Sequence, residues 1–173
     1  MDDLQKAAAI DTHDWHYVKY LADHYIAQKQ YKQALNTVSP YFGGHTENYI
    51  IGMLYARSLM LTGDYKTTEK LLDTLHVLPY EGAKDGHKLY EQTKLMLALQ
   101  SIKANKPDEA KQKVDDARQW PEHLGAGAPY PDLIDNKLEN DMDNAIRMLK
   151  EKKQVPAKQL NALETRIRAI NQN

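Results

Sequence analysis

Three glutamates lie in or beside segments rich in proline and glycine, in the kind of loop that often carries functional groups. They are Glu81, Glu91 and Glu122. Two carboxyl groups brought close together can act as general acid and general base. Nothing in their spacing sets the distance between them, so we assign no catalytic residue and expect the chain not to be an enzyme.

A second candidate site is the loop that contains Trp120, Glu122 and His123. With Glu81, these residues form a candidate ligand loop, because an aromatic ring beside a carboxylate often binds sugars. We favour the alternative, in which Trp120 anchors the loop on a helical surface and Glu122 accepts backbone hydrogen bonds. A long loop in a compact domain must be held down or serve a function.

A third cluster consists of His13, Asp14 and His16, within one turn near an expected helix start. Zinc requires three or four ligands, and His24 lies two turns further on. A surface cluster with Asp11 or Thr12 as helix cap explains the pattern. We therefore expect no metal and no cofactor.

Composition narrows the classes of partner. The 173 residues include 23 Lys and Arg against 24 Asp and Glu and no Cys. Such a balance gives no support to a nucleic-acid partner, and no apolar run approaches the ~18 residues of a membrane span. No signal sequence is recognisable at Met1. We expect a cytoplasmic protein by default, or a periplasmic one if the chain is a fragment.

The elements that would position these residues are helices in a repeating pattern. Ala22 and Ala34 flank a polar turn, and the same frame returns 34 residues later at Ala56 and Thr68. A third copy, with Ala98 and Ala110, lies 42 residues beyond Ala56. Small residues at these places let two antiparallel helices approach closely. Each turn should contain one left-handed residue, which the sequence places at Lys29, Gly63 and Asn105.

These copies resemble tetratricopeptide repeats. The resemblance implies an all-α, right-handed superhelix of antiparallel helix pairs in a single domain, 1–173, and a generic helical bundle is the alternative. The expected repeats span 14–41, 47–76 and 87–118, and capping helices follow at 132–171. Within the cap, one helix is expected over 132–153 and another after Pro156.

Proteins of this type usually bind extended peptides along the first helix of each pair. Projected on this sequence, the peptide-binding residues are His16, Lys19, Asp23, Ile50, Met53, Arg57, Met60, Gln92, Leu95 and Leu99. They do not match a carboxylate clamp, and the apolar, Met-containing lining suits an amphipathic helix or an apolar peptide. Two alternatives remain open: the chain's own C-terminal helix fills this groove, or the residues are interhelix core.

The two loops carry another resemblance. Leu78-Pro79-Tyr80-Glu81-Gly82-Ala83 and the segment from Trp120 to Tyr130 are similar to the repeat region of large bacterial proteins with a carbohydrate-related β-sandwich segment. Three functions follow as expectations. The first is a non-catalytic scaffold that binds a protein, a peptide or another domain of the same polypeptide. The alternatives are an accessory repeat domain of a carbohydrate-active enzyme and a homo-oligomerising module. We expect a monomer or a weak homodimer that binds neither nucleic acid nor membrane.

Overall fold

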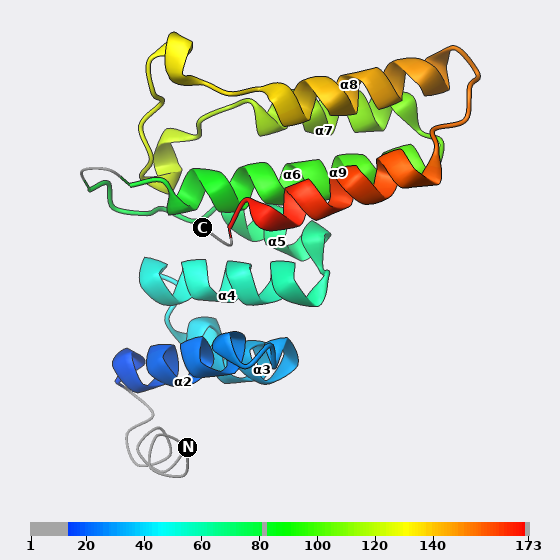
Figure 1. Cartoon of the computed structure of the whole chain (residues 1–173). Helices are drawn as coiled ribbons and strands as arrows, with labels where there is room; N and C mark the ends of the chain where they lie inside the picture. The colour runs from blue at the N-terminus through cyan, green and yellow to red at the C-terminus, as the bar shows by residue number, and fades with distance from the viewer. Residues whose placement is uncertain (1–13, 81–82, 172–173) are drawn as a thin grey trace. The chain divides into compact units, whose positions relative to one another are not determined.

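The computed structural model describes residues 14–80 and 83–171, which form α-helices and no strand (Figure 1). The all-α expectation is therefore confirmed for these ranges. The α-helices are α2 (Trp15–Ala27), α3 (Tyr31–Gly44), α4 (Tyr49–Thr62), α5 (Tyr65–Leu72), α6 (Asp85–Lys103), α7 (Pro107–Ala117), α8 (Lys137–Lys150) and α9 (Ala157–Ala169). Two short 3-10 turns, η1 (Glu122–Leu124) and η2 (Pro131–Leu133), lie between α7 and α8.

The chain divides into two compact units, Met1–Val77 and Leu78–Asn173, called unit 1 and unit 2 below. Within unit 1, α3 packs against α2 and α4, and α5 packs against α4. Within unit 2, α6 contacts α7, α8 and α9, and α8 contacts α7 and α9. Neighbouring helices along the sequence are thus packed against each other in both units.

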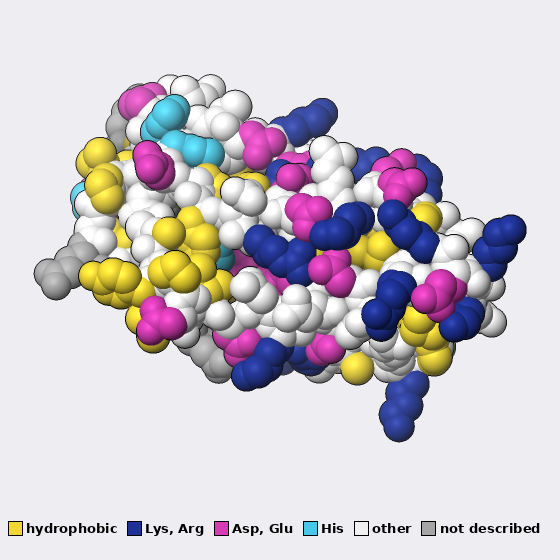
Figure 2. All heavy atoms as spheres, turned by 90° about the horizontal axis from the view of Figure 1, so that it is seen from above, with side chains coloured by type: hydrophobic (Ala, Val, Ile, Leu, Met, Phe, Trp, Pro, Cys, Tyr) yellow, Lys and Arg dark blue, Asp and Glu magenta, His cyan; other side chains and the backbone are white. Residues whose placement is uncertain are grey.

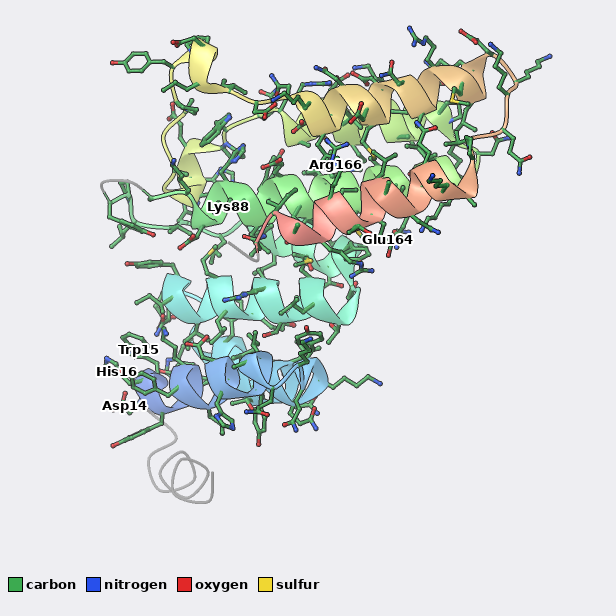
Figure 3. All side chains as sticks on the ribbon, viewed as in Figure 1. Asp14, Trp15, His16, Lys88, Glu164 and Arg166 are labelled. Atoms are coloured by element: carbon green, nitrogen blue, oxygen red, sulfur yellow. The ribbon has the colours of Figure 1, made fainter. Side chains whose placement is uncertain are left out.

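Side-chain caps start several helices of unit 1. The Asp14 carboxylate accepts a hydrogen bond from the backbone N–H of His16 at 2.9 Å, and Figure 3 shows both residues at the start of α2. Asp64 caps α5 in the same manner through the N–H of Thr67 at 3.2 Å. The expectation that Asp11 or Thr12 caps the first helix is therefore wrong for α2. Those two residues and His13 lie outside the described ranges.

The turns between paired helices contain the expected left-handed residues. The φ angles are 58° at Lys29, 89° at Gly63 and 56° at Asn105. Glycine adopts this conformation without a steric cost, whereas Lys29 and Asn105 carry a Cβ that opposes it. Lys152, after the end of α8, has the same conformation with a φ of 58°, a turn that the repeat pattern did not indicate.

The small residues of the repeat pattern are completely buried. The relative exposure is 0% for all six of them: Ala22, Ala34, Ala56, Thr68, Ala98 and Ala110. Because α2 packs on α3, α4 on α5 and α6 on α7, each pair has a small residue buried on both of its helices. The Thr68 hydroxyl donates to the Asp64 carbonyl at 2.7 Å, so its burial leaves no unpaired hydroxyl.

The C-terminal part differs from the expected helix over 132–153. The chain forms η2, runs extended at Ile134, and starts α8 at Lys137, where the Asp135 carboxylate accepts the Lys137 N–H at 3.0 Å. Helix α9 follows Pro156 as expected. The Gln92 amide donates to the Ile167 and Arg168 carbonyls at 2.9 and 3.1 Å. The end of α9 is thereby joined to α6.

Candidate functional site

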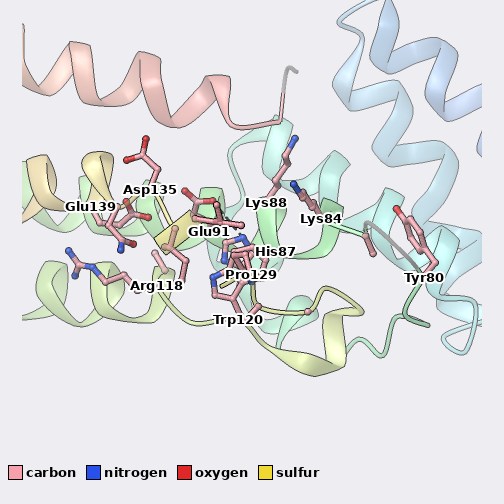
Figure 4. Close-up of a pocket in the computed structure, with 17 residues that line it drawn as sticks. Tyr80, Lys84, His87, Lys88, Glu91, Arg118, Trp120, Pro129, Asp135 and Glu139 are labelled. Atoms are coloured by element: carbon pink, nitrogen blue, oxygen red, sulfur yellow. Dashed lines mark ion pairs between the residues drawn. The ribbon is translucent and has the colours of Figure 1, made fainter. Parts of the chain in front are cut away.

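Unit 2 contains a cavity of about 650 Å³. It is enclosed by the first half of α6, the end of α7, the loop between α7 and α8, and the start of α8 (Figure 4). Its volume lies in the range of ligand pockets, which are typically ~300–1,000 Å³. The residues at its floor, its wall and its rim differ in chemical character.

The floor is a pair of carboxyl groups, Glu91 on α6 and Glu139 on α8. Burial, with a smaller contribution in the same direction from the adjacent Glu139, raises the pKa of Glu91 to about 7. Burial also raises the pKa of Glu139 above its usual range. The two carboxyl groups therefore bind protons at a higher pH than exposed glutamates do.

One carboxylate oxygen of Glu139 is buried without a hydrogen bond from the described residues. The residue is 3% exposed, and within the described residues its Oε2 atom has no hydrogen-bond partner. An unpaired buried polar atom costs free energy, and native proteins contain few such atoms.

One wall of the cavity is a stack of two aromatic rings, His87 and Trp120. Their ring centroids are 3.4 Å apart and their planes differ by 9°. Burial lowers the pKa of His87 to about 4, against a smaller opposite contribution from the Gln119 backbone. The His87 Nδ1 lies 3.8 Å from the Glu91 Oε2. Between about pH 4 and about 7 this is a contact of neutral groups, because the imidazole is unprotonated and Glu91 holds its proton.

The loop that supplies Trp120 is held against the start of α6 by a close backbone approach. A Cβ on Gly86 would lie 2.2 Å from the Leu124 carbonyl oxygen. Only glycine fits this place, which is the second residue of α6. This approach places His87, the next residue of α6, beside Trp120.

Three cationic side chains line the cavity: Lys84, Lys88 and Arg118. Arg118 is already paired, because its guanidinium contacts Asp115 at 2.9 Å and Asp143 at 2.7 Å. Lys88 lowers the pKa of Glu91, but this is the smallest of the influences on that residue, and the net shift is upward. The effect of Lys88 is thus smaller than that of burial, and the pKa of Glu91 stays above its usual range.

The rim carries exposed apolar side chains. Leu78 is 65% exposed, Tyr80 60%, Tyr130 78% and Leu133 68%. Of these, Tyr80 and Leu133 line the cavity, and the other two lie within three residues of them in the sequence. We call these four residues the apolar rim. Figure 2 shows hydrophobic side chains gathered toward one end of the face it displays, and Lys and Arg toward the other.

The candidate ligand-loop residues are only partly brought together. Trp120 and Glu91 line the cavity, whereas Glu122 is exposed and does not line it. His123, which is half-buried, is also absent from the lining, and Glu81 lies outside the described residues. The carboxyl group that meets Glu91 belongs to Glu139.

The sequence reasoning missed Glu139 and His87. Glu139 had a recognisable signal: it precedes Met142 by three residues and Ile146 by seven, so it lies on the apolar face of α8. A carboxylate at such a position must find a polar environment in the fold. No comparable signal distinguished His87 from the other six histidines.

The proposed peptide-binding residues fall into two groups. In unit 1, His16 and Arg57 are exposed, Ile50 and Met53 are half-buried, and Met60 is 4% exposed. Lys19 and Asp23 form an ion pair with a 2.6 Å separation. In unit 2, the relative exposure of Gln92, Leu95 and Leu99 is 2%, 0% and 1%. These last three are core residues in this structure, consistent with the alternative that the groove positions are interhelix core.

Two further features of the described residues bear on the site. None of their His, Asp and Glu side chains form a group of three that could hold a metal ion. None of the helices within 14–80 and 83–171 has the length and apolar character needed to cross a membrane.

The comparisons with known proteins add no family assignment. Neither the protein-family models, nor the curated proteins, nor the solved structures contain a match to this chain. The geometry of the cavity in unit 2 is therefore the basis for the functional argument.

Proposed function

We propose that this chain is a non-catalytic interaction module of the tetratricopeptide type, which binds an extended segment of a protein partner or of another domain of the same polypeptide. The binding surface is the apolar rim together with the cavity it surrounds. The observation that carries the proposal is the exposure of four large apolar side chains on the two segments beside one polar cavity. Exposed apolar patches on soluble proteins commonly mark interaction sites.

The extent of the rim favours a polypeptide over a small molecule. A small ligand would contact the cavity walls, which include Tyr80 and Leu133. Leu78 and Tyr130 are also exposed but do not line the cavity. A polypeptide segment can cover these outer residues and place one side chain in the cavity, as anchor residues do at protein interfaces.

The rival role, as an accessory domain of a carbohydrate-active enzyme, has little support from the candidate ligand loop, because Glu122 and His123 do not line the cavity. The homo-oligomer alternative also loses its expected surface, because Leu163 and Ile167 of α9 are buried in unit 2.

The tetratricopeptide-type superhelix is part of this proposal. It is supported by the left-handed turn residues Lys29, Gly63 and Asn105 and by the complete burial of the small residues on each helix pair. Extended binding surfaces are characteristic of such repeat architectures.

The test is selection of binding peptides from a random library displayed on phage, with the full chain as bait. We expect selected peptides to lose affinity by about tenfold or more when Tyr130 and Leu133 are both changed to Ser, as expected for central interface anchors. Tyr20→Ser is the matched control, because Tyr20 is 57% exposed and lies in unit 1. Peptides that bind the rim variant and the wild type equally would overturn the proposal.

A further inference from the structure

The cavity floor brings two carboxyl groups, Glu91 and Glu139, together in a largely buried place. Burial raises the pKa of both groups. Glu139 is 3% exposed, and its Oε2 atom has no hydrogen-bond donor among the described residues. A charge in such an environment interacts more strongly with an incoming cation than a surface carboxylate does.

A second buried atom at the cavity wall also lacks a partner. His87 is 7% exposed, and within the described part of the chain its Nε2 atom forms no hydrogen bond. The two atoms belong to α6 and α8, which lie on different sides of the cavity. The residues that line the cavity therefore include two buried polar groups, one on α6 and one on α8.

Charged groups on or beside four helices act on the carboxyl groups of the cavity lining. Lys88 on α6 lowers the pKa of Glu91, Arg118 on α7 lowers that of Glu139, and Asp135 before α8 raises that of Glu139. From α9, Arg166 acts on Asp135. Lys84 also lines the cavity and is exposed.

The walls above the floor are apolar. Trp120, Pro129 and Ile134 line the cavity between the carboxyl pair and the apolar rim. Such walls suit the methylene stem of a long basic side chain, which remains apolar up to its charged end. An indole ring also attracts a cation through its electron-rich face.

We propose that the cavity receives a Lys or Arg side chain of the partner segment, whose ammonium or guanidinium group donates hydrogen bonds to the Glu91 carboxylate and lies beside Glu139. This inference rests on the proposed function, since the apolar rim binds the residues that flank the basic one. An ammonium group carries three N–H donors and a guanidinium five, enough to pair both carboxylates.

A bound cation favours the ionised form of Glu91, so binding displaces the proton that Glu91 holds below a pH of about 7. The basic side chain keeps its own protons, and the displaced proton goes to solvent, so charge and protons balance. Below the pKa of Glu91, about 7, binding must expel this proton. Affinity therefore falls by up to about tenfold per pH unit as pH decreases below about 7, and is constant above it. His87, with a pKa of about 4, does not titrate in that window.

The experiment uses peptides that flank a central position with apolar residues and that differ only at this position. The central residue is Lys, Arg, Gln, norleucine or Glu, and affinity for the full chain is measured by calorimetry at about pH 5.5 and about pH 7.5. We expect Lys and Arg peptides to bind at least about tenfold more tightly than norleucine at the higher pH, and to lose this advantage at the lower one.

Two substitutions locate the effect. Glu139→Gln and Glu91→Gln each remove one carboxylate with little change of shape, and each should reduce the preference for Lys over norleucine. Glu122→Gln is the matched control, because Glu122 is exposed and lies outside the cavity lining. Folding of each variant is checked by circular dichroism.

The outcomes separate the inference from the proposed function. A norleucine or Glu peptide that binds as well as the Lys peptide, with binding still dependent on Tyr130 and Leu133, would overturn the cation site and leave the interaction module standing. Retention of the Lys preference in both Gln variants would also overturn it. If no peptide of the series binds the full chain, both the cation site and the interaction module are overturned.

Discussion

Unit 1 and unit 2 bury polar side chains in different ways. Among the described residues of unit 1 the buried polar residues are Ser58 and Thr68, and each hydroxyl donates to the carbonyl four residues earlier. In unit 2, Thr93 is paired in the same local way, but His87, Gln92 and Glu139 are also buried, and their surroundings come from other elements. Local pairing requires no particular tertiary structure, whereas the polar groups of unit 2 depend on the path of a loop and on helix packing.

The comparison indicates that the two units have different roles. The core of unit 1 is that of a structural repeat, in which burial of polar groups has been kept local. Unit 2 keeps a pair of carboxyl groups and a histidine out of water, which destabilises a fold unless those groups bind something. Perturbed titration at a cavity is more common at functional sites than elsewhere.

The largest expected effect comes from a comparison of two proposed groove positions, one fully buried and one half-buried. Leu95→Ala removes a side chain that is 0% exposed and should lower the free energy of unfolding of unit 2 by ~2–5 kcal/mol. Met53→Ala, at a half-buried position of α4, should cost well under half as much. Urea unfolding followed by tryptophan fluorescence and circular dichroism measures both. Equal losses would remove the distinction between core and surface at these positions.

The next effect concerns the pH dependence of stability. The folded-state pKa of Glu91 is raised from 4.5 to about 7, so its contribution to stability is present below pH 4.5 and is lost as pH rises through 7. The pKa of His87 is lowered from 6.5 to about 4, so its contribution is present above pH 6.5 and is lost as pH falls through 4. Each change amounts to about 3 kcal/mol, and they largely cancel in the wild type.

Single variants should therefore reveal opposite slopes. Glu91→Gln leaves the histidine, and stability should rise with pH between about 4 and about 6.5. His87→Phe keeps a ring against Trp120 and leaves the glutamate, so stability should fall with pH between about 4.5 and about 7. Urea midpoints at several pH values measure this. Parallel pH profiles for the two variants would contradict the assignment.

A smaller effect is expected from two glycines in similar helical surroundings. Gly86→Ala places a Cβ against the Leu124 carbonyl at 2.2 Å and should destabilise unit 2 by ~1–3 kcal/mol, because backbone must move. Gly43→Ala, in α3 of unit 1, meets nothing within 4 Å. It should leave stability unchanged or raise it by up to ~1 kcal/mol, as alanine favours the helix. Thermal unfolding compares the pair, and equal shifts would rule out the close approach.

The smallest effect is expected from exposed ion pairs, which occur in both units. The Lys19–Asp23 pair in unit 1 and the Lys103–Glu164 pair in unit 2 have separations of 2.6 and 2.7 Å. Lys19→Ala and Lys103→Ala should each change the free energy of unfolding by less than ~1 kcal/mol, since exposed charges are screened by solvent. A loss above 2 kcal/mol at either site, by the same unfolding assay, would indicate a role beyond surface pairing.

The helix pairs were predictable because their signals are local. Ala22 and Ala56 lie in the same register, and Gly63 marks a turn by its residue type. The start of α8 was misplaced, because the apolar spacing continues through Ile134 while the Asp135 side chain stops the helix there. Local periodicity does not report such a capping interaction.

The site was less predictable, because its parts meet only in the tertiary structure. Glu91 and Trp120 were candidates on residue type. Their partners, Glu139 and His87, depend on how α8 and the loop after α7 pack on α6. A carboxylate on an apolar helix face was the one available signal, and it indicates an unusual environment without naming the partner.

The most direct test of the account is the titration of the glutamate side chains, followed through their carboxyl carbons by NMR on the full chain. The account predicts that Glu91 titrates near pH 7, and that Glu139→Gln moves this titration. Glutamates that all titrate near their usual pKa of about 4.3 would contradict it, because no buried carboxyl pair would then exist in unit 2.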